Sequence, residues 1–201
     1  MDALGMLSQQ FQTVNIRVHH ALTAITPDMR LQRAAPTSNP LGFLLWHMSR
    51  SQDWGFNACV RGVPEVAHQQ PWADSSIGRL RGTGTAFTRQ EVDEIARNLD
   101  LDEFGAYADE VNAEALRWLE SLDEADLDAI PDVAGHLAGL PEYQRADFVE
   151  ELNSGPEHDA AIEETGGQPT WLFLTSVCVT HLHRHLGEID LTLGVLTGRA
   201  G

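Results

Sequence analysis

Two histidines near the end of the chain, His181 and His185, are four residues apart in a segment that is predicted to be helical. Residues i and i+4 of a helix lie on one face, with Cβ atoms about 5–6 Å apart. Two imidazoles on one face can bind the same transition metal, because metal–nitrogen bonds of about 2.0–2.1 Å require rings that converge. His183, between them, points to another side of the helix. A metal site usually needs a third protein ligand, which another part of the chain must supply.

His47 is the candidate for that third ligand. It lies in a second predicted helix, within the apolar run LLWHM at residues 44–48. A histidine in such a run is either buried with a hydrogen-bond partner or bound to a ligand. Position alone leaves both alternatives open.

Hydrophobic residues recur at helical spacing along much of the chain, and no segment shows the alternation typical of a strand. Thr88 and Glu91 form a capping-box pattern before a short helix. Ser38 or Asn39 is expected to cap the second long helix, with Pro40 in its first turn. Long helices are predicted over residues 2–25, 40–61, 101–122 and 169–198. This pattern predicts an all-α four-helix bundle, a fold in which metal sites form in the core between facing helices.

Two segments lack helical periodicity. Residues 64–85 contain Gly, Pro and Ser and are predicted to be a loop. Residues 123–168 are acidic and rich in turn-forming residues, with short helices predicted near 125–130 and 142–152. Both segments are therefore expected to connect the long helices.

Composition narrows the classes of partner. The chain has 201 residues, with 13 basic and 30 acidic side chains and a net charge of −17. Such a surface repels phosphate groups, which argues against nucleic acid and anionic membranes as partners. No run approaches the ~20 apolar residues of a membrane helix, and the N-terminus lacks the pattern of a signal peptide. We expect one domain, residues 1–201, in the cytoplasm.

Two stretches carry a family resemblance: NPLGFLLWHMSR at residues 39–50, followed by Asp53 and Trp54, and HLHRHLGEI at residues 181–189. Together they resemble the DinB / YfiT-like superfamily, which includes thiol-dependent S-transferases and the mycothiol-dependent maleylpyruvate isomerase. Its fold is a four-helix bundle with one histidine on the second helix and an HxxxH pair on the last. The resemblance implies that His47, His181 and His185 are ligands of a divalent metal, zinc or nickel.

The activity that this resemblance implies involves small molecules. A low-molecular-weight thiol would react with an electrophilic substrate in an S-transferase or isomerase reaction, or the metal would activate a water molecule for hydrolysis. The alternative is a non-catalytic, stress-associated helical bundle whose histidines hold a structural metal or are vestigial.

Residues 131–168 form a longer insertion than a compact family member needs. They are expected to act as a lid over the site, as a dimer contact or as a partly ordered excursion. A homodimer is expected because symmetric dimers are the commonest oligomers.

Glu188 is the candidate catalytic residue outside the metal ligands. It follows His181 by seven residues, so it lies about 20° from the direction of that histidine around the helix. It could hydrogen-bond a ligand, act as a base, or form a salt bridge near the helix end. Arg50 and Asp53, three residues apart, are expected to pair with each other and not with the metal.

The remaining histidines and the cysteines are expected to lie outside the site. His19 and His20 are neighbours on the first helix, so at most one can face the bundle centre. No regular element is predicted around His158. Cys59 and Cys178 have neither a CxxC partner nor a nearby activating histidine, which predicts buried thiols in a reducing compartment.

Overall fold

The computed structural model describes residues 2–78, 82–84, 87–140 and 167–198. Within these residues the chain forms helices and no strands. The helices are α1 (Ala3–Ala24), α2 (Leu41–Asp53), α3 (Arg89–Asn98), α4 (Leu101–Leu119), α5 (Glu124–Asp128), α6 (Val133–Gly139), α9 (Thr170–Phe173) and α10 (His181–Thr197). Short 3₁₀ turns, Val66–His68 and Trp72–Asp74, interrupt the predicted loop 64–85.

The starts of the helices follow local capping rules. Asp2 accepts a hydrogen bond from the backbone N–H of Gly5 at the start of α1. The predicted capping box between Thr88 and Glu91 is confirmed at the start of α3. The prediction for α2 was wrong, because the helix begins at Leu41 with Pro40 as its N-cap and no side-chain hydrogen bond.

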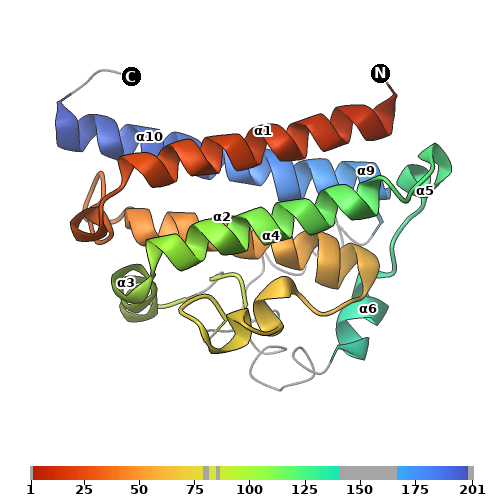
Figure 1. Cartoon of the computed structure of the whole chain (residues 1–201), viewed down its shortest axis with the longest axis horizontal. Helices are drawn as coiled ribbons and strands as arrows, with labels where there is room; N and C mark the ends of the chain where they lie inside the picture. Colours follow the sequence, from red (N-terminus) through yellow and green to blue (C-terminus); the bar gives the residue numbers. More distant parts are fainter. Residues whose placement is uncertain (1, 79–81, 85–86, 141–166, 199–201) are drawn as a thin grey trace.

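In the part of the chain that the structure describes, the longest helices, α1, α2, α4 and α10, pack around one core. α1 contacts α4 and α10, and α2 contacts α3, α4 and α10. α1 and α10 run in one direction, while α2 and α4 run in the other (Figure 1). The core contains side chains from each stretch, including Phe11, Val18, Leu44, Phe56, Phe104, Val111, Phe173 and Ile189. Each fully buried side chain of this kind contributes about 1.5–3 kcal/mol to the stability of the fold.

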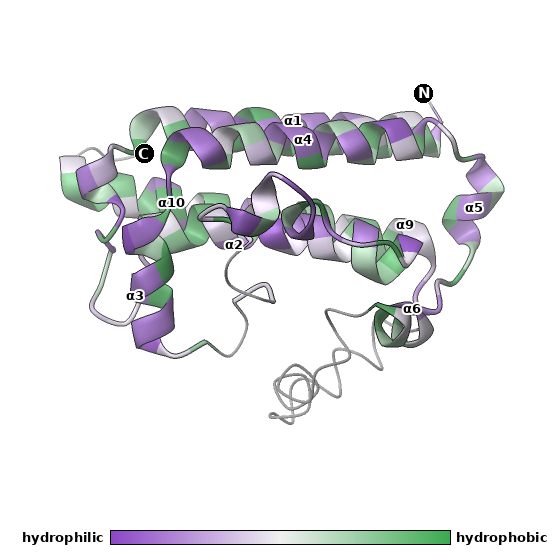
Figure 2. Cartoon of the chain, turned by 60° about the horizontal axis from the view of Figure 1, so that its bottom comes forward, coloured by the Kyte–Doolittle hydropathy of each residue, from purple (hydrophilic) through white to green (hydrophobic). Residues whose placement is uncertain are grey.

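Hydrophilic and hydrophobic residues alternate along the ribbons of α1 and α4 (Figure 2), as amphipathic helices require. The apolar side chains of these two helices that are buried include Leu7, Val14 and Ala108. None of the described helices is both long and apolar enough to cross a membrane.

Two π-helical segments extend the helices that carry the candidate ligands. α2 continues as Trp54–Arg61, and Leu174–Thr180 leads directly into α10. The two segments contact each other, and a Cβ atom on Gly55 would lie 2.9 Å from Sγ of Cys178. Glycine is therefore required for this close approach. The sequence pattern predicted regular helices here, and π-helical turns are frequent near functional sites.

The acidic segment 123–168, which includes the predicted insertion 131–168, is described at residues 123–140 and 167–168. The helix predicted near 125–130 is confirmed as α5, and α6 forms at residues 133–139 and packs against the Trp54–Arg61 segment. Nδ1 of His136 lies 2.8 Å from the carbonyl oxygen of Cys59 at this contact. The helix predicted at 142–152 lies outside the described residues.

Candidate metal centre

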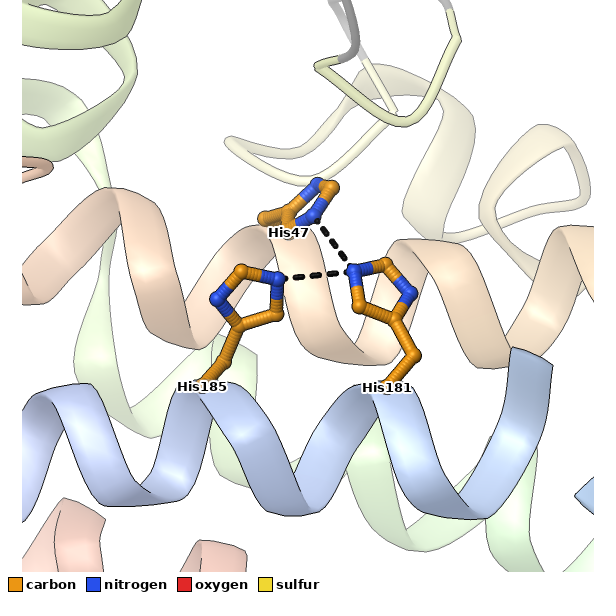
Figure 3. Close-up of side chains that lie close together, drawn as sticks. All are labelled: His47, His181 and His185. Atoms are coloured by element: carbon orange, nitrogen blue, oxygen red, sulfur yellow. Dashed lines mark hydrogen bonds between the residues drawn. The ribbon is translucent and has the colours of Figure 1, made fainter. Parts of the chain in front are cut away.

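The structure brings together the three histidines that the sequence analysis selected. His47 lies in the middle of α2, and His181 and His185 lie in the first two turns of α10. Nε2 of His181 is 3.2 Å from Nε2 of His47 and 2.7 Å from Nε2 of His185 (Figure 3). The candidate ligand atoms all lie within 4.8 Å of one another. The prediction that the three rings converge is confirmed, whereas metal binding by these residues stays a prediction.

The second ring nitrogen of two histidines has its own partner. Nδ1 of His47 lies 2.5 Å from the carbonyl oxygen of Thr83, and Nδ1 of His185 lies 3.1 Å from Oε2 of Glu188. Carbonyl and ionised carboxylate oxygens only accept hydrogen bonds, so both Nδ1 atoms carry the hydrogen. The Nε2 atoms of these two rings therefore present lone pairs to the centre, which is the usual arrangement of histidines that bind a metal.

The three Nε2 atoms cannot all be paired with one another by hydrogen bonds. Nε2 of His181 faces the other two, but it can carry only one hydrogen, so at most one of the two contacts is a full hydrogen bond; without that hydrogen, both contacts place two lone pairs together. A cation between the rings would remove this repulsion. Tetrahedral bonds of about 2.0–2.1 Å place ligand nitrogens about 3.4 Å apart, which is close to one observed separation and longer than the other. Three neutral imidazole nitrogens within 4.8 Å of one another are therefore a donor set that fits a divalent metal.

Burial keeps the three imidazoles neutral near pH 7. Loss of solvent lowers the pKa of His47 to about 4. It also lowers the pKa of His181 to about 3, and the neighbouring His47 and His185 act in the same direction. Burial lowers the pKa of His185 as well, although the hydrogen bond that His185 donates to Glu188 opposes the change. Neutral imidazoles have the lone pair that a metal needs, so no proton must leave before binding.

The candidate ligand His185 and its partner Glu188 differ in exposure. The side chain of His185 is 4% exposed, whereas that of Glu188 is 43% exposed. On the other helix, the ring of Phe43 stacks on His47, with ring centroids 5.4 Å apart and planes 8° apart. Water therefore has little access to His47, and more access beside Glu188.

Glu188 makes two of the contacts that the sequence predicted for it, a hydrogen bond with a candidate ligand and a salt bridge. Its Oε2 contacts His185, and its Oε1 lies 3.9 Å from Nε of the exposed Arg184. Because Glu188 contacts Nδ1 of His185 and the metal position is at Nε2, this geometry favours an orienting role over direct proton transfer. A catalytic role stays a prediction.

Other histidines and the cysteines lie away from the centre. Nδ1 of His183 is 2.9 Å from Nη1 of Arg17, and Nε2 of His19 is 2.7 Å from Asp109. His20 is exposed, and His158 lies outside the described residues. The free thiols of Cys59 and Cys178 are fully buried, and burial raises the pKa of both, so neither is suited to act as a nucleophile.

Sequence reasoning missed two partners of α2. Arg50 and Asp53 do pair, with 3.7 Å between Nη1 and Oδ2, but Glu65 lies nearer to Arg50, at 2.8 Å. The second omission is the carbonyl of Thr83, a backbone atom that no side-chain motif marks. The only signal in the sequence is its place between Gly82 and Gly84, where the chain can adopt a positive φ.

A helical protein with three converging histidines on facing helices is the class that this fold and site define. A model of the DinB superfamily matches residues 10–189, and the chain belongs to that superfamily. No curated protein sequence matches the chain. A crystal structure described as a conserved protein from Enterococcus faecalis has a TM-score of 0.68, with 16% sequence identity and 99% of each chain covered. At this identity the likeness shows the fold alone.

Proposed function

We propose that this protein is a metal-dependent enzyme that binds zinc or nickel through Nε2 of His47, His181 and His185. The observation that carries the proposal is the convergence of three neutral nitrogens, two of them on rings whose other nitrogen is held by an acceptor. Among the described residues, the group contains no fourth His, Cys, Asp or Glu. A three-histidine set with no fourth protein ligand is typical of catalytic sites and not of structural ones.

The substrate pair proposed here is a low-molecular-weight thiol and an electrophile. When bound, the metal would supply a Lewis-acidic position at which a thiol or a water molecule loses its proton near neutral pH. The neutral histidines would hold the ion without cancelling its charge, and Thr83 and Glu188 would orient two of the rings. Phe43 would exclude water from the His47 side. Family membership supports the thiol, and hydrolysis through activated water is the neighbouring reaction.

A non-catalytic bundle with a structural or vestigial site is the second candidate. The observation that favours it is the burial of His47 and His185, which are 8% and 3% exposed. Such burial leaves little room for a substrate unless the neighbouring chain moves. The two candidates differ in whether an added thiol can reach the metal.

The test is metal analysis of the purified protein, followed by titration of the cobalt-loaded protein with a small thiol. We expect about one metal per chain, lost in His47→Ala and retained in the matched control His183→Ala. A thiolate-to-cobalt charge-transfer band on adding the thiol would support the enzyme. Metal bound without any such band would contradict the thiol reaction, and no metal in the wild-type protein would contradict the proposal as a whole.

The proposed architecture is a single four-helix-bundle domain, residues 1–201, formed by α1, α2, α4 and α10 with their π-helical extensions. We further propose that it acts in the cytoplasm, with residues 131–168 as a lid or dimer contact. Exposed apolar side chains on α1 and α10, among them Ile16, Leu191 and Val195, support a homodimer. A single sedimenting species near the chain mass of 22.1 kDa would contradict the dimer.

A further inference from the structure

Two neighbouring carbonyl groups attach the loop at residues 82–84 to α2. Nη2 of Arg50 donates a hydrogen bond to the carbonyl oxygen of Gly82, at 3.2 Å. The next carbonyl, that of Thr83, lies 2.5 Å from Nδ1 of His47. His47 and Arg50 are three residues apart on α2, so they present the same face of the helix to the loop.

Arg50 is itself buried beside two carboxylates. Its side chain is fully buried, and its Nη1 lies 2.8 Å from Oε2 of Glu65 and 3.7 Å from Oδ2 of Asp53. The nearby carboxylates raise the pKa of Arg50, although burial alone would lower it. The guanidinium is therefore charged at every pH at which the protein folds, and its planar shape allows it to contact Glu65 and Gly82 together.

Asp53 attaches the other end of the same loop. Its carboxylate accepts hydrogen bonds from the backbone N–H groups of Val66, at 3.0 Å, and Ala67, at 2.9 Å. The hydroxyl group of Tyr107 on α4 also donates to it, at 2.8 Å. The buried charges of α2 thus hold residues 65–67 and Gly82 against the helix that carries His47.

Gly84 brings the loop against the aromatic partner of His47. Its φ of +95° is strained for other residues, and an added Cβ would lie 2.8 Å from the ring of Phe43. Phe43 in turn stacks on His47. A displacement of this loop would therefore change both the hydrogen-bond partner and the stacking partner of His47.

Buried ion pairs often contribute little net stability, because removing charges from water is costly. The contacts of Arg50 point to another role. We propose that Arg50 is a positioning residue of the three-histidine centre: it holds the carbonyl of Gly82, which places the carbonyl of Thr83 on Nδ1 of His47 and leaves the lone pair on Nε2. The consequence for metal affinity rests on the proposed function, but the tautomer of His47 can be measured in the metal-free protein.

The experiment compares Arg50→Lys with Arg61→Lys. Lysine keeps the charge beside Glu65 but cannot contact a carboxylate and the Gly82 carbonyl with a planar fork. Arg61 lies further along the same continuous helix and pairs with Glu114 at 2.7 Å, away from the loop at residues 82–84, which makes it the matched control. Long-range ¹H–¹⁵N NMR reports the tautomer of His47, and chelator competition reports the Kd for zinc.

We expect His47 to carry its hydrogen on Nδ1 in the wild-type protein and in Arg61→Lys. In Arg50→Lys we expect a mixture of tautomers and a zinc affinity about 10–100-fold lower. Should Arg50→Lys fail to fold, Gly84→Ala displaces the loop while leaving the ion pairs in place, and the same changes are expected.

The outcomes are distinguishable. Wild-type His47 with its hydrogen on Nε2 would overturn the proposal without any variant, as would a folded Arg50→Lys with an unchanged tautomer and Kd. A tautomer change in a protein that binds no zinc would support the positioning role and contradict the proposed metal function.

Discussion

The two helices that form the centre hold their histidines by different means. On α10, His181 and His185 are neighbours by helical spacing, and the partner of His185 is the half-exposed side chain of Glu188, three residues further along. On α2, His47 is buried, and its partner is the backbone carbonyl of Thr83, 36 residues further along the chain. The α10 pair is local and its partner Glu188 is half-exposed, whereas the α2 side depends on long-range contacts in the interior.

This difference separates two contributions to a metal site. A local pair provides two ligands as soon as the helix forms, because residues i and i+4 share a face. A ligand whose orientation depends on a distant loop reaches that orientation only when the whole chain has folded. We therefore expect the pair on α10 to provide most of the affinity for a metal, and the α2 side to complete the proposed site once the chain has folded.

Replacement of His181 by alanine is expected to have the largest effect, because Nε2 of His181 contacts both other rings. Zinc bound by four ligands contributes about 10–16 kcal/mol, so one ligand accounts for about 3 kcal/mol, or roughly 100-fold in affinity. Chelator competition should show a loss of zinc affinity of at least that size.

His183→Ala is the control for this prediction, because its ring contacts Arg17 instead of the centre. Equal zinc affinities for the two variants would contradict the assignment. His47→Ala sharpens the comparison: a much smaller loss than for His181→Ala would mean that the α2 side contributes little to binding.

The second prediction concerns the pH dependence of the metal-free protein. An unfolded histidine has a pKa of about 6.5, whereas burial lowers the pKa of folded His47 to about 4 and that of His181 to about 3. Between these values the unfolded chain binds protons that the folded chain does not, so stability falls as pH decreases from about 6.5 to about 4. For His47 alone the loss is about 3 kcal/mol.

Urea denaturation at pH 7.5, 5.5 and 4.5 would measure this loss. His47→Gln removes one titrating group and should make the unfolding free energy less dependent on pH, with the exposed His20→Gln as control. The same slope in wild type and His47→Gln would show that His47 is not buried in neutral form. The lowered pKa values also mean that protons should compete with the metal mainly below about pH 5.

The comparison of the two helices also explains which parts were predictable from the sequence. Helical spacing predicted the pair His181 and His185, and the order of the family motifs added His47. The capping box of Thr88 predicted the start of α3 because it depends on four consecutive residues. Local chemistry and spacing were sufficient for these features.

The features that were missed depend on contacts over longer distances. Glu65 and Thr83 lie in a segment without periodicity, so no pattern indicated their contacts with α2. The π-helical segments have the same hydrophobic composition as ordinary helix, and seven or eight residues are too few to distinguish the two by spacing. Ser38 or Asn39 was expected to cap α2, but neither side chain does, and the hydroxyl group of Ser38 instead donates to the carbonyl of Ala35 in a local turn.

The smallest expected effect comes from Glu188, on the open side of the centre. Glu188→Gln keeps an oxygen that can accept from Nδ1 of His185 but removes the charge, and Glu188→Ala removes both. Loss of a hydrogen-bond partner of a ligand typically lowers metal affinity about 10–100-fold, and we expect the low end for alanine because Glu188 is half-exposed. Glutamine should lower the metal affinity less than alanine does.

Arg184→Gln is the control, since Arg184 contacts Glu188 only at 3.9 Å and is mostly exposed. Solvent and salt screen an exposed charge, so the difference in metal affinity between wild type and Glu188→Gln should shrink at 0.5 M salt. The effect of Arg50→Lys should not shrink, because Arg50 lies deep in the interior. A salt-independent loss in Glu188→Gln would mean that the carboxylate acts on the metal site from a buried position, and the contrast between the two helices would then be wrong.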